Sequence, residues 1–391
     1  MLYEKSWARA WLGFGLVWFI AAIALAPSNK LYQQGVVLFL WLPTLVLAWS
    51  ARGVFMEAWR RQPVLWGALL ALMLWAGLSL SWSSSEEPGR EVKRLVYILM
   101  FLMAFPLLAQ AGLVRIRHLL QLGGGLLAIA ALISIINFYV VLGIPLMGRL
   151  EGIGEISHPI LGAYVVGAAV LMLLYQVPHK RGAQVAWFVA LACLGAFVLL
   201  SQSRGAALAL VLTAVLAPLW FRDRHSRLIA IAAVLASGLA FYMLYNVITA
   251  RGSSFRPEIF QSVLQMIGEH PWTGLGLGAE YKVSAAGMLF DHSHNMFTHV
   301  AMELGLTGML LWIAVWLFTL GEIVRARDTV LGKILLALWV YSTMAMQFDA
   351  ASLTGTPRAE WFVSWLTVGL VMLLPWGRAE NGACGKISGS T

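Results

Sequence analysis

Residues 119–142 read LLQLGGGLLAIAALISIINFYVVL, an apolar run without a single charged side chain. The hydrocarbon core of a bilayer is about 30 Å thick, and a helix of roughly 20 apolar residues crosses it. This run therefore predicts one membrane-spanning helix. Similar runs recur along the whole chain, at residues 11–27, 35–50, 63–82, 95–110, 159–177, 184–202, 205–220, 228–248, 296–320, 330–348 and 360–376.

The composition assigns the whole chain to one class. Of 391 residues, 60% are hydrophobic and only 12% are charged. A soluble protein of this size cannot bury so much apolar surface, so lipid must form part of its surroundings. The sequence predicts an all-α, polytopic integral membrane protein with about twelve transmembrane helices. Residues 1–376 are expected to form one transmembrane domain, and the Gly- and Ser-rich residues 377–391 a disordered cytoplasmic tail.

The distribution of basic residues predicts the orientation. If the N-terminus is cytoplasmic and the spans alternate, 17 of the 27 Lys and Arg residues fall on the cytoplasmic side and ten on the outer side. This asymmetry obeys the positive-inside rule and places both termini in the cytoplasm. The net charge of +9 then mainly reports topology, and we expect no nucleic-acid partner.

Two outer connections are long enough to carry function. Residues 249–294 exceed the usual length of an unstructured loop, which indicates a functional element. Within it, residues 256–268 have the apolar spacing of a short amphipathic helix that lies on the membrane or caps a cavity. The second connection, residues 142–159, contains Arg149 and His158.

Arg204 is the most informative single charge. Ser203, Arg204 and Gly205 interrupt two apolar runs at the outer surface, where Ser203 can cap the following helix. Because a helix N-terminus stabilises anions, an Arg beside it is favourable when an anion is bound there. The alternative is an interfacial Arg that reaches lipid phosphates.

Other outer cations have simple explanations as well as functional ones. Arg256 in the long loop is either solvated or a ligand contact. Three further basic residues neighbour Glu86, Glu87 and Glu91, so local ion pairing competes with contact to anionic lipid. These residues are Arg90, Lys93 and Arg94.

His294 offers acid–base chemistry, because an imidazole titrates near neutral pH and can accept a proton from a hydroxyl. A capping or packing role is the alternative. His292 and His294 have only Asp291 nearby, which falls short of a metal site, so we expect no metal ion and no cofactor. No carboxylate is placed to orient a base in a nucleophilic triad. The Gly274–Gly278 run predicts a tight turn and not a dinucleotide fingerprint.

These motifs, taken in order, resemble the O-antigen ligase superfamily. His294-Asn295, nine residues, Gly305, two residues and Gly308 match its His-Asn and Gly-x-x-Gly signature. The Ser203-Arg204-Gly205 turn and the glycine run after Pro271 match as well, so the resemblance covers about residues 200–310. The superfamily includes O-antigen ligases, O-antigen polymerases and O-linked oligosaccharyltransferases. A single large outer loop and the lack of a long C-terminal extension favour the lipopolysaccharide ligase.

The resemblance implies a membrane glycosyltransferase of type C-like fold in the bacterial inner membrane, with its catalytic loop 249–294 in the periplasm. The donor would be O-antigen on undecaprenyl pyrophosphate, and the acceptor a sugar hydroxyl of lipid A–core. Arg204 and Arg256 would bind the pyrophosphate and His294 would activate the hydroxyl, with inversion and without a metal. The further substrate-binding residues would be Arg149, His158, Arg90, Lys93, Arg94, Trp272 and Asn295.

Two other functions remain open. A polymerase would use the same donor but lengthen the glycan on its polyprenol carrier. A polyprenol-lipid flippase or transporter could also have twelve spans and a basic cavity. Against a transporter, most spans carry no ionisable residue at mid-membrane, and we find neither paired broken helices nor an inverted repeat in the sequence.

Overall fold

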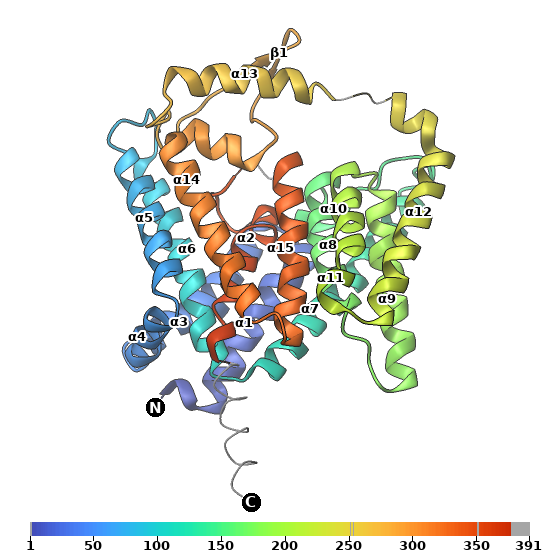
Figure 1. Ribbon diagram of the computed structural model, residues 1–391, viewed down its shortest axis with the longest axis horizontal. Coiled ribbons are helices and arrows are strands. Elements are labelled where there is room, and N and C mark those ends of the chain that lie inside the picture. The colour runs from blue at the N-terminus through green and yellow to red at the C-terminus, as the bar shows by residue number, and fades with distance from the viewer. Residues whose placement is uncertain (1, 251, 253, 350–351, 377–391) are drawn as a thin grey trace, which may run out of the picture.

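The computed structural model describes residues 2–250, 252, 254–349 and 352–376, and the predicted tail 377–391 lies outside them. Most of the described chain is helical (Figure 1). The 3₁₀ and π segments are labelled η. In chain order the elements are η1 (Leu2–Glu4), α1 (Ser6–Leu25), α2 (Asn29–Val36), η2 (Val37–Trp41), α3 (Leu42–Ala48), α4 (Arg52–Arg61), α5 (Pro63–Ser79), α6 (Pro88–Ala109), α7 (Leu113–Ile136), η3 (Asn137–Val141), η4 (Gly154–Ile156), α8 (Pro159–Leu174), α9 (Arg181–Leu200), α10 (Arg204–Leu216), α11 (Pro218–Phe221), α12 (Arg224–Ala250), α13 (Arg256–Glu269), β1 (Val283–Ala285), β2 (Met288–Phe290), α14 (Met296–Arg325), α15 (Val330–Phe348), η5 (Ala359–Phe362) and α16 (Trp365–Val371).

The helices confirm the all-α polytopic membrane fold. Ten helices among the described residues are long and apolar enough to span a bilayer. The bent pair α4–α5, with an angle of 102° between its parts, makes eleven if it counts as one span. The remaining predicted span, residues 159–177, corresponds to the shorter apolar helix Pro159–Leu174. The predicted number of about twelve spans is therefore slightly higher than the ten or eleven described helices that are long enough to cross a bilayer. Each predicted span nevertheless has a helix in the structure.

A small residue allows two of the central helices to pack closely. α7 packs closely against α1 and α8, and a Cβ at Gly123 would lie only 2.7 Å from the side chain of Ile20. Lipid is as apolar as the helix surfaces, so the hydrophobic effect does little to bring helices together in a membrane. Small residues allow the helix backbones to approach closely and pack by van der Waals contact. α16 is almost wholly buried among its neighbours, whereas α12 is exposed along most of its length.

The long loop predicted over 249–294 forms a small layer across one end of the helices. α13 and the antiparallel hairpin β1–β2 lie at the end opposite α4 (Figure 1). Ile259, Val263 and Ile267 on one face of α13 are buried against the hairpin and the start of α14. The predicted amphipathic helix is therefore present, and its apolar face covers protein.

A break in α14 joins this layer to the membrane helices. Gly305 has φ 69° and ψ −178°, so the helix is interrupted there and cannot form its regular hydrogen bonds. The carbonyl oxygens of Met302 and Glu303 instead accept the N–H groups of Leu275 and Gly276, at 2.9 and 2.8 Å. The glycine run is thus the tight, packed turn predicted, and it satisfies the backbone of the broken helix.

Candidate active site

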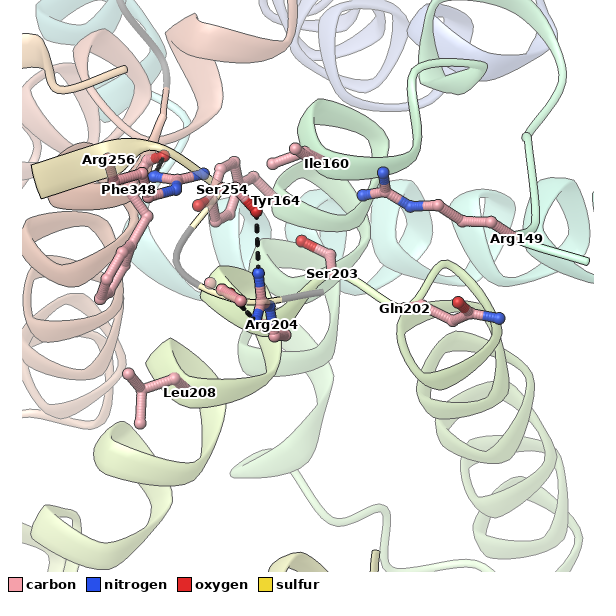
Figure 2. Close-up of a pocket in the computed structure, with 12 residues that line it drawn as sticks. Arg149, Ile160, Tyr164, Gln202, Ser203, Arg204, Leu208, Ser254, Arg256 and Phe348 are labelled. Atoms are coloured by element: carbon pink, nitrogen blue, oxygen red, sulfur yellow. Dashed lines mark hydrogen bonds between the residues drawn. The ribbon is translucent and has the colours of Figure 1, made fainter. Parts of the chain in front are cut away.

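A cavity of about 350 Å³ lies at the end of the helices that carries the long loop. Its walls come from α8, α10, the start of α13 and the end of α15 (Figure 2). The lining residues are Arg149, Ile160, Tyr164, Gln202, Ser203, Arg204, Gly205, Leu208, Gly252, Ser254, Arg256 and Phe348. The structure therefore brings together three arginines that the sequence spreads over more than a hundred residues.

Neutral oxygens hold the three guanidinium groups in place. Arg149 donates to the carbonyl of Ser201 at 2.9 Å, and Arg256 donates to the carbonyl of Phe348. Arg204 donates to the carbonyl of Gly252 and to the hydroxyl of Ser254, at 2.9 and 3.0 Å. Among the described residues that line the cavity there is no carboxylate. Three converging positive charges therefore favour an anionic ligand in this space.

Two buried hydroxyl groups face the same cavity. Tyr164 and Ser203 are 0% and 3% exposed, and neither hydroxyl has a hydrogen-bond partner among the described residues. A Cβ at position 205 would lie 2.6 Å from the Tyr164 oxygen, so Gly205 leaves room for this hydroxyl. Ser203 does occupy the N-cap position of α10, but its side chain makes no capping bond, contrary to our expectation. Buried polar groups are rarely left unsatisfied, so two hydroxyls unpaired within the described chain, in the wall of this cavity, are compatible with a polar ligand.

His294 lies at the junction of the loop and α14, in a left-handed backbone conformation with φ 52°. The next residue, Asn295, fixes this junction. Its side chain accepts the N–H groups of Phe297 and Thr298 at 2.9 and 3.2 Å, and donates to Gln347 at 3.0 Å. Asn295 thus caps α14 and ties it to the end of α15, so its polar atoms are used in structural bonds.

Asp349, directly after α15, is the partner of His294 that the sequence did not reveal. Its Oδ1 lies 3.7 Å from Nδ1 of His294, beyond hydrogen-bond distance but within range of strong attraction. Burial acts to raise the pKa of this carboxyl, but His294, His292 and Arg256 outweigh it and hold the pKa below its usual value. The sequence indicated no carboxylate placed beside a base, whereas the structure places Asp349 next to His294. Asp349 is 55 positions from His294, and only the packing of α15 against α14 brings them together.

The end of α15 also connects the two parts of the site. Phe348 lines the arginine cavity and accepts from Arg256, while the following residue faces His294. Arg256 and His294 are thus both placed beside the end of α15, through Phe348 and Asp349. A joint role of guanidinium and imidazole groups remains a prediction.

The remaining predicted residues divide into near and distant groups. His158 caps α8 by accepting the N–H of Leu161 at 3.2 Å, and burial lowers its pKa although the charge of Asp349 acts against that shift. The positive charges of Arg149 and His294 lower the pKa of His158 as well. Trp272 is 64% exposed and does not line the arginine cavity.

The cluster of basic residues at the start of α6 does not line the arginine cavity either. Arg90 pairs with Glu87 at 2.8 Å, and Arg94 pairs with Glu91. Lys93 lies over the ring of Tyr97. Local ion pairing, one of the two explanations considered from sequence, therefore accounts for Arg90 and Arg94.

His292, His294 and Asp349 form a cluster whose possible ligand atoms all lie within 4.8 Å of one another. The sequence offered only two imidazoles, and the structure supplies the third group. Burial and the neighbouring His294 lower the pKa of His292, which favours its neutral form. Neutral imidazoles and a carboxylate are ligands that zinc accepts, so this cluster has the composition of a small metal site as well as of an oriented base.

The fold and the site define a class: a multi-pass membrane enzyme with a cationic cavity and a carboxylate-paired histidine at one end of its helices. Residues 187–313 match the O-antigen ligase family. The chain is also 33% identical over 315 residues to the O-antigen ligase of Pseudomonas aeruginosa, covering 78% of this chain and 77% of the relative. The chain belongs to the O-antigen ligase family, whose activity is a lipid-linked glycosyl transfer in lipopolysaccharide biosynthesis.

Proposed function

We propose that this enzyme transfers O-antigen from undecaprenyl pyrophosphate to a sugar hydroxyl of lipid A–core, on the periplasmic face of the inner membrane. Lipid-linked O-antigen and lipid A–core are the substrates that membership of the family implies. The polyprenol pyrophosphate, the inverting course and the catalytic residues are our proposals. The observation that carries them is the arginine cavity beside the pair of His294 and Asp349.

The arginine cavity suits the pyrophosphate of the donor. Guanidinium groups bind phosphate oxygens through charge-assisted, often paired, hydrogen bonds. Arg204 and Arg256 would hold the pyrophosphate, with Arg149 as a third contact. The hydroxyls of Tyr164 and Ser203 would donate to remaining phosphate oxygens. As the bond between the sugar C1 and the phosphate oxygen breaks, the same groups would stabilise the negative charge that collects on the leaving group.

His294 would act as the general base. Its Nδ1 faces the carboxylate of Asp349, which favours a proton on Nδ1 and leaves Nε2 to accept one. Nε2 would take the proton of the acceptor hydroxyl as that oxygen forms a bond to C1 of the donor sugar. The C1–phosphate bond breaks on the opposite face, so the anomeric configuration inverts. Undecaprenyl pyrophosphate leaves, and Asp349 stabilises the imidazolium.

We propose a reaction without a metal ion, because arginine side chains supply the positive charge at the leaving group. The alternative follows from the cluster of His292, His294 and Asp349, which has enough ligands to hold a metal. In that case a chelator would abolish transfer. In the metal-free mechanism, transfer persists in EDTA.

The proposed orientation rests on the charge asymmetry. We place both termini in the cytoplasm and the catalytic loop 249–294 in the periplasm, within one transmembrane domain of residues 1–376. The position of α13 and the hairpin at the end opposite α4 supports this arrangement, because α4 carries Arg60 and Arg61 at its C-terminal turn.

The products of one reconstituted reaction test the proposal. Enzyme, undecaprenyl-linked O-antigen and lipid A–core are combined in proteoliposomes, with the two lipids on the same face. A ligase attaches the polysaccharide to lipid A–core. A polymerase instead lengthens the glycan on the polyprenol, and a flippase forms no glycosidic bond. Either of the last two results would contradict the proposed function.

A further inference from the structure

A second polar groove of about 380 Å³ lies outside the arginine cavity and shares no lining residue with it. It runs between α2, the π-helical segment η2, the start of α6 and the segment before η5. The lining residues are Asn29, Lys30, Gln33, Gln34, Val37, Trp41, Arg90, Tyr97, Thr356 and Arg358. Its composition is cationic, aromatic and amide-rich.

The positive charge comes from Lys30, Arg90 and Arg358, which belong to three distant parts of the sequence. Within the described ranges, Lys30 and Arg358 form no salt bridge. Arg90 pairs with Glu87, but both side chains are more than half exposed, so the pair is weak and exchangeable. No carboxylate is among the groove's described lining residues. The groove thus favours an anion such as a phosphate group.

The floor of the groove is aromatic and has an unused donor. Trp41 is 4% exposed, and its ring stacks on that of Tyr97 with centroids 4.2 Å apart. Its indole N–H is buried without a hydrogen-bond partner among the described residues. A buried indole N–H normally has a partner, so this donor at the groove wall is compatible with a polar ligand, although Trp66, Trp220 and Trp312 also have indole N–H groups unpaired within the described ranges. Trp41 ends a π-helical segment, a local distortion that often marks functional sites.

The groove is also polar along its upper wall. Gln33 donates to Asn29 at 2.9 Å and to Thr356 at 3.2 Å, which fixes α2 against the segment that carries Arg358. Amide groups and an indole N–H suit the hydroxyls of a sugar, whereas the three cations suit a phosphate. The combination is the chemistry of a phosphorylated saccharide.

The position of the groove relates it to catalysis. Arg358 follows Asp349 by nine residues, so an extended chain limits their separation to about 30 Å. The groove therefore lies within reach of a large glycolipid whose sugar hydroxyl is at His294. Lys30, Arg90 and Arg358 all belong to outer connections in the predicted topology.

We propose that this groove binds the phosphorylated saccharide portion of the acceptor glycolipid and so aligns its distant sugar hydroxyl with the catalytic site. This inference rests on the proposed function, because it takes lipid A–core as the acceptor. Lys30 and Arg358 contact phosphate oxygens, and Trp41 contacts the sugar. An anionic phospholipid headgroup offers the same phosphate chemistry without the sugar.

Binding without donor separates this inference from catalysis. The full-length enzyme in lipid nanodiscs is titrated with lipid A–core, either intact or treated to remove its phosphates, and Kd is measured. The double variant Lys30→Gln/Arg358→Gln should weaken binding of the intact acceptor by about four- to 25-fold, since exposed charge contacts contribute about two- to fivefold each. Binding of the dephosphorylated acceptor and of the polyprenol donor should not change. Trp41→Phe keeps an aromatic ring but removes the indole N–H, and should weaken binding of both acceptor forms by about threefold.

Arg60→Gln, an exposed change on α4, is the matched control and should bind all ligands like the wild type. Equal affinity of the double variant and the wild type for the intact acceptor would overturn the inference. Competition by phosphatidylglycerol as effective as that by lipid A–core would show a phospholipid site instead. A wild type that discriminates the acceptors but transfers no polysaccharide would count against the proposed function only.

Discussion

Replacing Asp349 by Asn should slow transfer strongly while leaving the fold intact. The two side chains have nearly equal volume, so the change removes the charge and little packing. At 3.7 Å, attraction between a carboxylate and an imidazolium is about 4.5 kcal/mol at an effective dielectric constant of 20, and about 1 kcal/mol in bulk water. The Asp349 side chain is 7% exposed and that of His294 is 26% exposed, so an intermediate value of about 2–3 kcal/mol applies. This corresponds to a fall in kcat of roughly 30- to 150-fold.

The assay is single-turnover transfer in proteoliposomes with enzyme in excess, which separates chemistry from product release. Donor Kd should stay near the wild-type value, because Asp349 does not line the arginine cavity. Asp328→Asn, an exposed change in a turn, is the matched control. The pKa of Asp349 is held low, so its carboxylate stays charged as pH falls through neutrality. Because the Asn variant carries no such charge to stabilise a protonated base, it should move the acid limb of the pH–rate profile to lower pH. A rate within about threefold of the wild type, with an unshifted profile, would refute the role of Asp349.

Three further predictions concern other parts of the site. Tyr164→Phe should raise donor Kd by about three- to tenfold. The thermal midpoint should not fall, because the lost hydroxyl has no partner among the described residues. An unchanged Kd would show that the Tyr164 hydroxyl does not contact the donor. Gly305→Ala should destabilise the protein by about 1–3 kcal/mol, since φ is 69° and a Cβ would lie 2.2 Å from the carbonyl oxygen of Trp272; an unaltered melting curve would contradict this. Transfer should persist in EDTA, and loss of activity that zinc restores would favour the metal alternative.

The membrane fold was predictable because its signals are local. Each span is an apolar run whose length is set by the bilayer, and each predicted run has a helix in the structure. The amphipathic stretch over 256–268 likewise gives its own periodicity, and α13 follows it. The hairpin β1–β2 was missed because its strands are only three residues long.

The site was predictable only in part, because its geometry depends on contacts between distant segments. Arg204, Arg256 and His294 stood out as polar groups at the edges of apolar runs. Asp349 had the same signal, an acid at the end of the span 330–348, but nothing in the sequence indicated that α15 meets α14 beside His294. Tyr164 gave no signal at all, because a tyrosine within an apolar helix is most often a packing residue.

The central claim is that arginine side chains bind the donor while His294 performs the transfer. The most direct test measures donor binding and transfer together for Arg204→Ala and His294→Ala, with each protein folded in membranes. We predict that Arg204→Ala loses donor binding and therefore transfer, whereas His294→Ala binds donor like the wild type but transfers no polysaccharide. Continued attachment of polysaccharide to lipid A–core by either variant would contradict the account.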